Sequence, residues 1–307
     1  MVSLRARLAR AFLRIRTRRR KPGLPMEERR RLLDRLGEAV RPAAGVAVST
    51  IDAAGVPAEW LVPDGAGADE AILYLHGGAY TAGSCRSHRH GVSHIAKATG
   101  MRVLLPEYRL APEHPFPAAL EDALAVWRWM LDQGYRSDRI VLAGDSAGGG
   151  LALAVMVALR EAGNALPAAA SLISAWTDLA ATGDSLDSRR RQDPWIRPDE
   201  LEPMARRYYQ DRDPRNPLVS PLYASLHGLP PLMLQVGDFE ALLSDTTRLA
   251  EKARDAGVDV TLRVWPGMWH VWHFFVGRVP ESRQAILEMA AFIEARMAES
   301  RRGQRAA

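Results

Sequence analysis

Short hydrophobic runs alternate with segments of helical periodicity along most of the chain after residue 70. The hydrophobic runs lie at 71–75, 101–106, 139–144, 169–174, 231–237 and 259–265. The segments with helical spacing lie at 87–99, 117–133, 147–162, 239–256 and 281–300. Continuous apolar strands that alternate with helices are typical of a parallel sheet buried on both faces. The pattern therefore predicts an α/β fold with a mostly parallel sheet flanked by helices.

The pattern before residue 70 is different. Residues 1–20 and 26–40 have helical spacing, whereas 46–51 and 60–62 have the pattern of short strands around the turn Ala54-Gly55. In the first helix, apolar residues recur every three to four positions, at Leu4, Leu8, Phe12 and Ile15. This spacing predicts a helix that docks onto the protein through that stripe.

One later segment interrupts the alternation of strands and helices. Residues 183–218 are rich in proline and charge, and they form a longer connection than a simple crossover needs. An insertion at this point should lie over the carboxyl edge of the sheet, where ligands bind in such folds. We therefore expect a single domain over residues 1–307, with a helical cap made of about 1–42 and 183–218.

Composition narrows the class of protein. The 307 residues are 47% hydrophobic and 25% charged, proportions that are typical of a globular protein. No run of about 18 apolar residues is present, so no membrane-spanning helix is predicted. The first residues lack the apolar stretch and cleavage site of a secretory signal, so we expect a cytoplasmic protein. The single cysteine, Cys85, rules out an intramolecular disulfide.

Positive charge is concentrated at the start of the chain. The net charge is +5, but residues 1–21 alone carry nine basic residues and no acidic one, which leaves about −4 for the remainder. Such a segment could bind the phosphates of nucleic acid or lipid. We favour a docked helix with a solvated arginine face, because apolar stripes of this kind usually serve packing. Neither nucleic-acid binding nor stable membrane association is therefore expected.

The strongest chemical signal is Gly144-Asp145-Ser146-Ala147-Gly148-Gly149, which fits the pattern Gly-x-Ser-x-Gly. The motif follows a predicted strand and opens a predicted helix. In that context the serine occupies a strained turn, and the flanking glycines allow close approach of the backbone. The helix N-terminus offers N–H groups and a positive dipole end to a developing anion. Ser146 is therefore predicted to be a nucleophile.

A second motif, His76-Gly77-Gly78-Ala79-Tyr80, follows the strand predicted at 71–75. Glycine-rich backbone at the end of a strand can direct N–H groups at a ligand, and with the residue after the nucleophile it would form an oxyanion hole. His76 is expected to orient this loop, and Gly77 to shape it. The residues assigned to the hole are Gly77, Gly78, Ala79 and Ala147.

These two motifs, with the segments 108–122, 220–231 and 266–270, resemble the hormone-sensitive-lipase family of α/β-hydrolases over nearly the whole chain. The resemblance implies an eight-stranded, mostly parallel sheet, a helical cap and a Ser–acid–His triad. It also implies hydrolysis of small, fairly hydrophobic esters or lactones without a metal or organic cofactor, and it leaves a homodimer open. Ala79 stands where the family usually has a third glycine, but its N–H is retained. The aromatic residues expected to line the substrate pocket are Tyr80, Trp195, Tyr208 and Tyr209.

The family's chain order places the acid and then the histidine after the serine. His270 follows Pro266-Gly267-Met268-Trp269 at the family's position for the base, whereas His273 is expected to pack or face solvent. Three carboxylates follow the strand at 231–237, and these are Asp238, Glu240 and Asp245. Glu240 fits the family's acid–x–Leu pattern and its spacing to the histidine, although the family usually has Asp there. We predict Glu240 as the acid that orients His270, with Asp238 as a helix cap.

Two other interpretations of the sequence compete with a serine esterase. Cys85, His88, His90 and His94 include an i, i+4 histidine pair of the kind zinc sites use. Interleaved arginines and the lack of a nearby carboxylate argue against it, so no metal site is expected. A catalytically inactive hydrolase fold that serves as a small-molecule receptor is the alternative function, but such a receptor would not need both Ser146 and His270.

Overall fold

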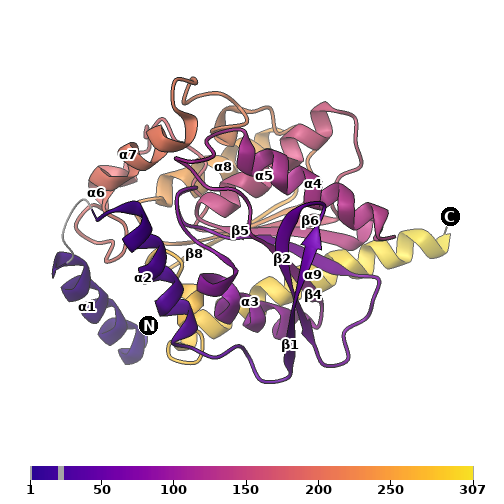
Figure 1. Ribbon diagram of the computed structural model, residues 1–307, viewed down its shortest axis with the longest axis horizontal. Coiled ribbons are helices and arrows are strands. Elements are labelled where there is room, and N and C mark those ends of the chain that lie inside the picture. Colours follow the sequence, from indigo (N-terminus) through magenta and orange to yellow (C-terminus); the bar gives the residue numbers. More distant parts are fainter. Residues whose placement is uncertain (1, 20–23, 307) are drawn as a thin grey trace.

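The computed structural model describes residues 2–19 and 24–306 (Figure 1). In this part of the chain an eight-stranded sheet has the order β1-β2-β4-β3-β5-β6-β7-β8. Its strands are β1 (Val46–Ala53), β2 (Val56–Pro63), β3 (Ala71–Leu75), β4 (Arg102–Pro106), β5 (Ile140–Asp145), β6 (Ala169–Ile173), β7 (Leu232–Gly237) and β8 (Val260–Trp265). β2 pairs antiparallel with β1 and β4, and the other neighbours are parallel. The predicted α/β fold with a mostly parallel sheet is confirmed.

Helices cover both faces of the sheet. The helices are α1 (Leu4–Arg19), α2 (Met26–Glu38), α3 (Cys85–Thr99), α4 (Ala118–Asp132), α5 (Ala147–Glu161), α6 (Ser185–Ser188), α7 (Pro198–Tyr209), α8 (Leu243–Asp255) and α9 (Pro280–Ala306), with 3-10 turns η1 (Ser137–Arg139), η2 (Pro221–Tyr223) and η3 (Trp272–Phe275). Every residue of β3, β5, β6 and β7 is buried, and alternate side chains enter two separate cores. Leu142, for example, packs with α4, α5 and α8, whereas Val141 packs with α3 and α9. The strands are apolar throughout because both faces are covered.

The β1–β2 hairpin and helix α8 are among the elements whose extent differs from the predicted range. β1 and β2 form a longer hairpin than expected, and both turn residues, Ala54 and Gly55, have positive φ, which suits a two-residue hairpin turn. The helix predicted at 239–256 begins at Leu243, because Glu240 lies in a turn where its carboxylate accepts a hydrogen bond from the N–H of Gly237. The candidate acid is thereby held in a loop rather than on a helix.

The prediction for the stripe of α1 was wrong. Leu4, Leu8, Phe12 and Ile15 are 71%, 62%, 57% and 53% exposed. The helix docks instead through its opposite face, where Ala6 and Leu13 are buried against tryptophans of the segment 265–272. Small residues allow the helix to approach closely there, and Arg10 reaches the carbonyl of Gly267. The side of the helix with fewer large apolar residues is therefore the one that packs.

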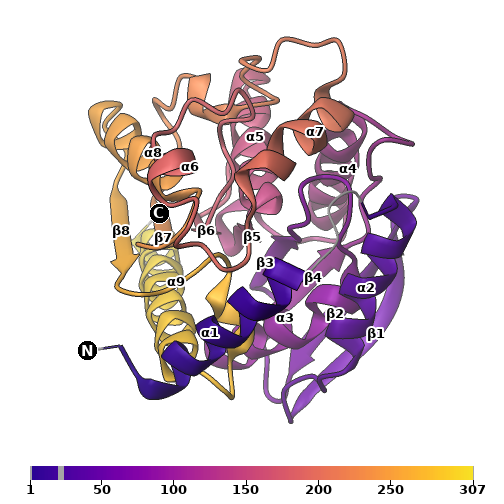
Figure 2. The ribbon, with the colours of Figure 1, turned by 90° about the vertical axis from the view of Figure 1, so that its left-hand side faces the viewer.

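The N-terminal helices and the inserted segment lie on one side of the sheet. In Figure 1, α1, α2, α6 and α7 occupy its left-hand side. Figure 2, in which this side faces the viewer, shows α1 and α2 below and α6 and α7 above, around the ends of the central strands. No helix among residues 2–19 and 24–306 is both long and apolar enough to cross a membrane.

Candidate active site

Ser146 lies on a strained turn between β5 and α5. Its backbone angles are φ 52° and ψ −123°, which non-glycine residues rarely adopt. A side chain at Gly148 would place its Cβ 2.0 Å from the carbonyl oxygen of Leu75, and one at Gly144 would lie 2.5 Å from the carbonyl of Gly148. Only glycine fits at these two positions. The motif thus holds Ser146 at the carboxyl end of the central strand and at the N-terminus of a buried helix.

His270 and Glu240 form a buried pair beside this turn. The imidazole Nδ1 of His270 lies 3.0 Å from Oε2 of Glu240, and the two side chains are 2% and 0% exposed. Burial lowers the pKa of His270, but the hydrogen bond and negative charge of Glu240, with a further contribution from Asp193, raise it more. The pKa therefore lies above the usual 6.5. An acid placed this way favours the tautomer that leaves Nε2 free to accept a proton.

The strand order brings the serine turn and this pair together. β5 and β7 both neighbour β6, and the N–H of Ser146 donates to the carbonyl of Ile173 at the end of β6. The next residue, Ser174, donates its hydroxyl to Oε1 of Glu240 at 2.7 Å and accepts from the N–H of Val271. One residue after β6 therefore connects the acid to the loop that carries His270.

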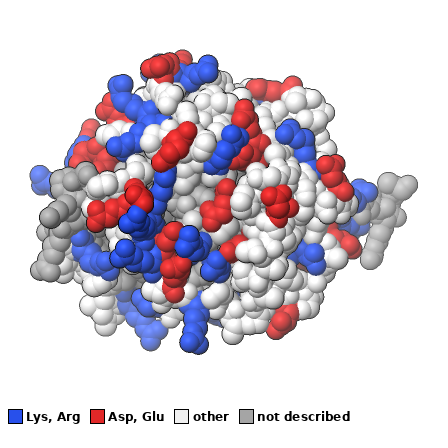
Figure 3. All heavy atoms as spheres, viewed as in Figure 1, with Lys and Arg blue, Asp and Glu red and all other residues white. Residues whose placement is uncertain are grey.

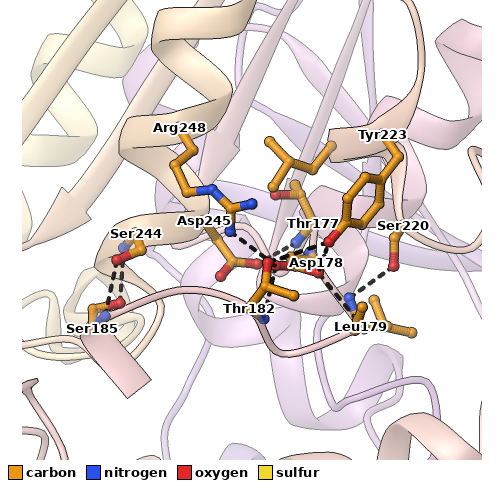
Figure 4. A network of polar contacts seen from close by, with 12 residues as sticks. Thr177, Asp178, Leu179, Thr182, Ser185, Ser220, Tyr223, Ser244, Asp245 and Arg248 are labelled. Carbon is orange, nitrogen blue, oxygen red and sulfur yellow. Dashed lines mark hydrogen bonds and ion pairs between the residues drawn. The ribbon is translucent and has the colours of Figure 1, made fainter. Parts of the chain in front are cut away.

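The other two candidate carboxylates bind elsewhere. Oδ1 of Asp238 accepts from the N–H of Gly267 at 2.6 Å, so it holds the histidine loop rather than capping a helix. Asp245 is buried on α8 and accepts from the backbone N–H groups of Thr177 and Asp178, each at 2.8 Å (Figure 4). Burial raises the pKa of Asp245 to about 7. Neither carboxylate contacts His270, so Glu240 best matches the role of the acid.

Asp178 anchors the chain that leads from β6 into the inserted segment. Its carboxylate accepts from Thr182, Tyr223 and Arg248, as Figure 4 shows. A neighbouring contact joins Ser185 of α6 to the carbonyl of Ala241, two positions before α8 begins. These bonds tie the start of the segment 183–218 to the loop that carries Glu240.

The loop at 76–80 presents backbone N–H groups toward the same edge of the sheet. Gly78, Ala79 and Tyr80 all have positive φ, at 126°, 57° and 58°. The N–H groups of Gly78, Ala79 and Ala147 donate to no acceptor within residues 2–19 and 24–306. They are therefore free to donate to a bound ligand, as the donors of an oxyanion hole would have to be.

Gly77 has a different role from these donors. Its N–H donates to Oδ1 of Asp145 at 3.1 Å, and a Cβ at this position would lie 2.2 Å from Oδ2 of the same carboxylate. This N–H is therefore already used inside the protein, which agrees with the expectation that Gly77 shapes the loop. Asp145, one residue before Ser146, fixes the loop against the strand that carries the nucleophile.

The expected pocket aromatics fall into two groups. Tyr80 stacks on Tyr208 of α7, with ring centroids 3.8 Å apart and planes 7° apart, and the adjacent Tyr209 is also buried. Trp195 packs instead against Phe275 and belongs to the core under α1. Tyr80 joins the loop at 76–80 to α7, whereas Trp195 lies in a different cluster.

Cys85 and the other histidines contact a variety of neighbours, and His90 and His94 pack edge to face with ring centroids 4.8 Å apart. His76 stacks on Tyr108, and burial lowers its pKa to about 3, in keeping with an uncharged role in the loop. His273 is buried and contacts Gln235 at 2.9 Å. Cys85 donates to the carbonyl of Leu105, and His88 faces Asp145. Across the described ranges, no three or more His, Cys, Asp or Glu residues form a group that could hold a metal ion.

Asp193 is a feature of the site that sequence reasoning missed. It is a buried carboxylate in the inserted segment, and it accepts from the N–H groups of Trp195, Ile196 and Ala241. Burial raises its pKa to about 6, while the nearby charge of His270 opposes that shift. Nothing in its local sequence distinguishes Asp193 from the exposed acids around it. It joins the inserted segment to the residue after Glu240.

Comparison with known proteins gives consistent matches. Residues 72–274 match the family model described as an alpha/beta hydrolase fold. An acetyl-hydrolase from Streptomyces hygroscopicus is 45% identical over 271 residues, covering 87% of this chain and 89% of the relative. An esterase from Acinetobacter venetianus is 36% identical over 264 residues, covering 86% and 87%. The crystal structure of an esterase from the bacterial hormone-sensitive lipase family superposes with a TM-score of 0.93 at 43% identity, covering 97% of this chain and 99% of that one.

Proposed function

Because this chain belongs to the hormone-sensitive-lipase family of α/β-hydrolases and is a carboxylic ester hydrolase, we propose that it acts through a Ser146–His270–Glu240 triad. The contact between Nδ1 of His270 and Oε2 of Glu240, buried beside the strained turn of Ser146, carries the proposal. This arrangement supplies a nucleophile, a base and an acid that orients the base.

The proposed reaction has two steps. His270 accepts the hydroxyl proton as Ser146 Oγ attacks the ester carbonyl, and the N–H groups of Gly78, Ala79 and Ala147 stabilise the oxyanion. His270 then gives the proton to the leaving alkoxide, which departs as an alcohol and leaves an acyl-enzyme. Water activated by His270 hydrolyses the acyl-enzyme and releases the acid. The carboxylate of Glu240 stabilises the imidazolium in both steps.

We further propose a cap made of about 1–42 and 183–218 and a preference for short- to medium-chain esters, with lactones as a second class. The contact of Thr17 with the carbonyl of Pro194 supports the cap, since it links its two parts. Arg30 of α2 also donates to the carbonyl of Thr81, next to the oxyanion loop. The name of the Streptomyces hygroscopicus relative, an acetyl-hydrolase, supports a short acyl group.

The decisive experiment combines labelling with substitution. An organophosphate should label Ser146 alone, and Ser146→Ala should lower kcat by several orders of magnitude without loss of fold. A panel of p-nitrophenyl esters of rising chain length, with a few lactones, should show the highest kcat/KM at short to medium acyl chains. Labelling of another residue, or an active Ser146→Ala variant, would refute the triad.

A further inference from the structure

The exposed stripe of α1 is an apolar surface bordered by arginines. At about 100° per residue, Leu4, Leu8, Phe12 and Ile15 fall within about 80° of the helix circumference. With the same angle per residue, Arg5 and Arg16 border the stripe on one side, and Arg7 and Arg14 border it on the other. The opposite face of the helix is the docked one, with Ala6 and Leu13 buried. The stripe therefore points away from the protein.

The arginines along the stripe have no acidic partner among the residues that the structure describes. Arg5, Arg7, Arg14 and Arg16 form no ion pair within the described ranges; Arg14 donates to a backbone carbonyl, and Arg16 lies over the ring of Phe12. Basic and acidic side chains are interspersed over the face drawn in Figure 3. The first 21 residues depart from that pattern, since their sequence contains nine bases and no acid.

We propose that α1 docks reversibly on an anionic lipid surface, with its apolar stripe in the interfacial region and its arginines on the lipid phosphates. Large apolar side chains in the middle and cations on both edges are the pattern of helices that lie in a membrane interface. Anionic headgroups complement a segment that contains no acidic residue. The docked face would keep the helix attached to the protein while the stripe enters the lipid.

Two other occupants fit this surface less well. A second copy of the chain would place α1 against α1 and bring arginines together without an acid to pair them. Nucleic acid would contact the arginines but would leave four large apolar side chains unmatched, because its binding is dominated by phosphate contacts.

The contacts of α1 place this surface beside the catalytic loops. Arg10 donates to the carbonyl of Gly267, three residues before His270, and lies 4.5 Å from the ring centroid of Phe239, which precedes Glu240. Docking would therefore bring the side of the molecule that carries the triad loops toward the lipid. The enzyme would meet esters that partition into the interface.

Vesicle sedimentation with the full chain tests the proposal. Binding should be at least about tenfold stronger to vesicles that are roughly one third phosphatidylglycerol than to pure phosphatidylcholine, and it should weaken as salt rises. The double variant Leu8→Asp/Phe12→Asp should lose at least about tenfold in binding. Substituting Gln for Arg5, Arg7 and Arg16 should cost about fivefold per arginine. The matched control is Leu287→Asp, a substitution of an exposed leucine on α9, which should bind like wild type.

An unchanged thermal midpoint shows that each variant folds, since the altered side chains are exposed. The proposal is overturned if wild type does not bind anionic vesicles at low salt, or if Leu8→Asp/Phe12→Asp binds them as wild type does. It is also overturned if size-exclusion chromatography shows a dimer for wild type and a monomer for that variant. The same holds if duplex DNA displaces wild type and the variant from the vesicles equally well.

Discussion

Replacing Glu240 by Gln should damage catalysis more than the loss of one negative charge alone would suggest. Oε1 of Glu240 accepts from the N–H of Gly237 at 2.6 Å and from the hydroxyl of Ser174 at 2.7 Å, while Oε2 faces Nδ1 of His270 at 3.0 Å. A Gln side chain has one oxygen and one NH₂ group, and the N–H of Gly237 can only donate. The oxygen must therefore face Gly237, which turns the NH₂ group toward His270.

That orientation forces Nδ1 of His270 to accept a hydrogen bond and moves the ring proton to Nε2. The histidine then cannot take the proton from Ser146. Loss of a charge-assisted hydrogen bond alone costs about 1.5–3 kcal/mol. The comparable change in a serine protease lowers kcat about 10⁴-fold. We expect kcat to fall at least about 10²-fold in Glu240→Gln, with the fold retained.

The assay is kcat on one short-chain ester for three variants under identical conditions. Asp238→Asn and Asp245→Asn are the matched controls, because each carboxylate binds backbone N–H groups and neither touches His270. Both should retain kcat far better than Glu240→Gln and act mainly on stability. If either control loses activity while Glu240→Gln stays near wild type, the assignment of the acid is refuted.

Three further outcomes follow from the same geometry. The kcat/KM of wild type should fall as the pH drops through a pKa above 6.5, because the raised pKa of His270 leaves the imidazole protonated below it. Glu240→Gln should move this acidic limb of the pH profile to lower pH. An acidic limb well below pH 6.5 in wild type would contradict the assignment. Gly77→Ala should lower kcat and cost about 1–3 kcal/mol of unfolding free energy, because its Cβ would meet Asp145, whereas Gly67→Ala, in open space, should change little. Deleting residues 1–20 should alter KM and acyl preference and lower the thermal midpoint, since the tryptophans of 265–272 lose the packing of Ala6 and Leu13. Unchanged kinetics and midpoint would show that α1 is not part of the cap.

The parts of the fold that follow from local patterns could be predicted from the sequence. The buried strands carry continuous apolar runs because both faces are covered, and the turn at Ser146 carries glycines where side chains would collide. The resemblance to the family favoured Glu240 among three carboxylates, although only the positions of Ser174 and Gly237 show why its carboxylate points at His270.

The features that the sequence did not predict correctly concern which residues pack together in the folded protein. The spacing of residues along one helix does not contain that information. The periodicity of α1 correctly predicts a helix, but Ala6 and Leu13 pack because the tryptophans of 265–272 are brought under them by the sheet. The role of Asp193 is hidden for a similar reason. Its partner Ala241 lies 48 positions away in the chain, and only the folded protein brings the two together.

The stack of Tyr80 on Tyr208 limits how this enzyme can be recombined with its relatives. Tyr80 belongs to the loop at 76–80, which carries two of the proposed oxyanion donors, and Tyr208 belongs to the insertion. The carbonyl of Tyr80 accepts from Ala111, and that of Tyr208 accepts from Phe116, so the segment 111–116 is bonded to both. A chimera that exchanges residues 183–218 alone would separate three segments that fit one another. The exchangeable module for altering selectivity is therefore the insertion together with residues 76–80 and 111–116.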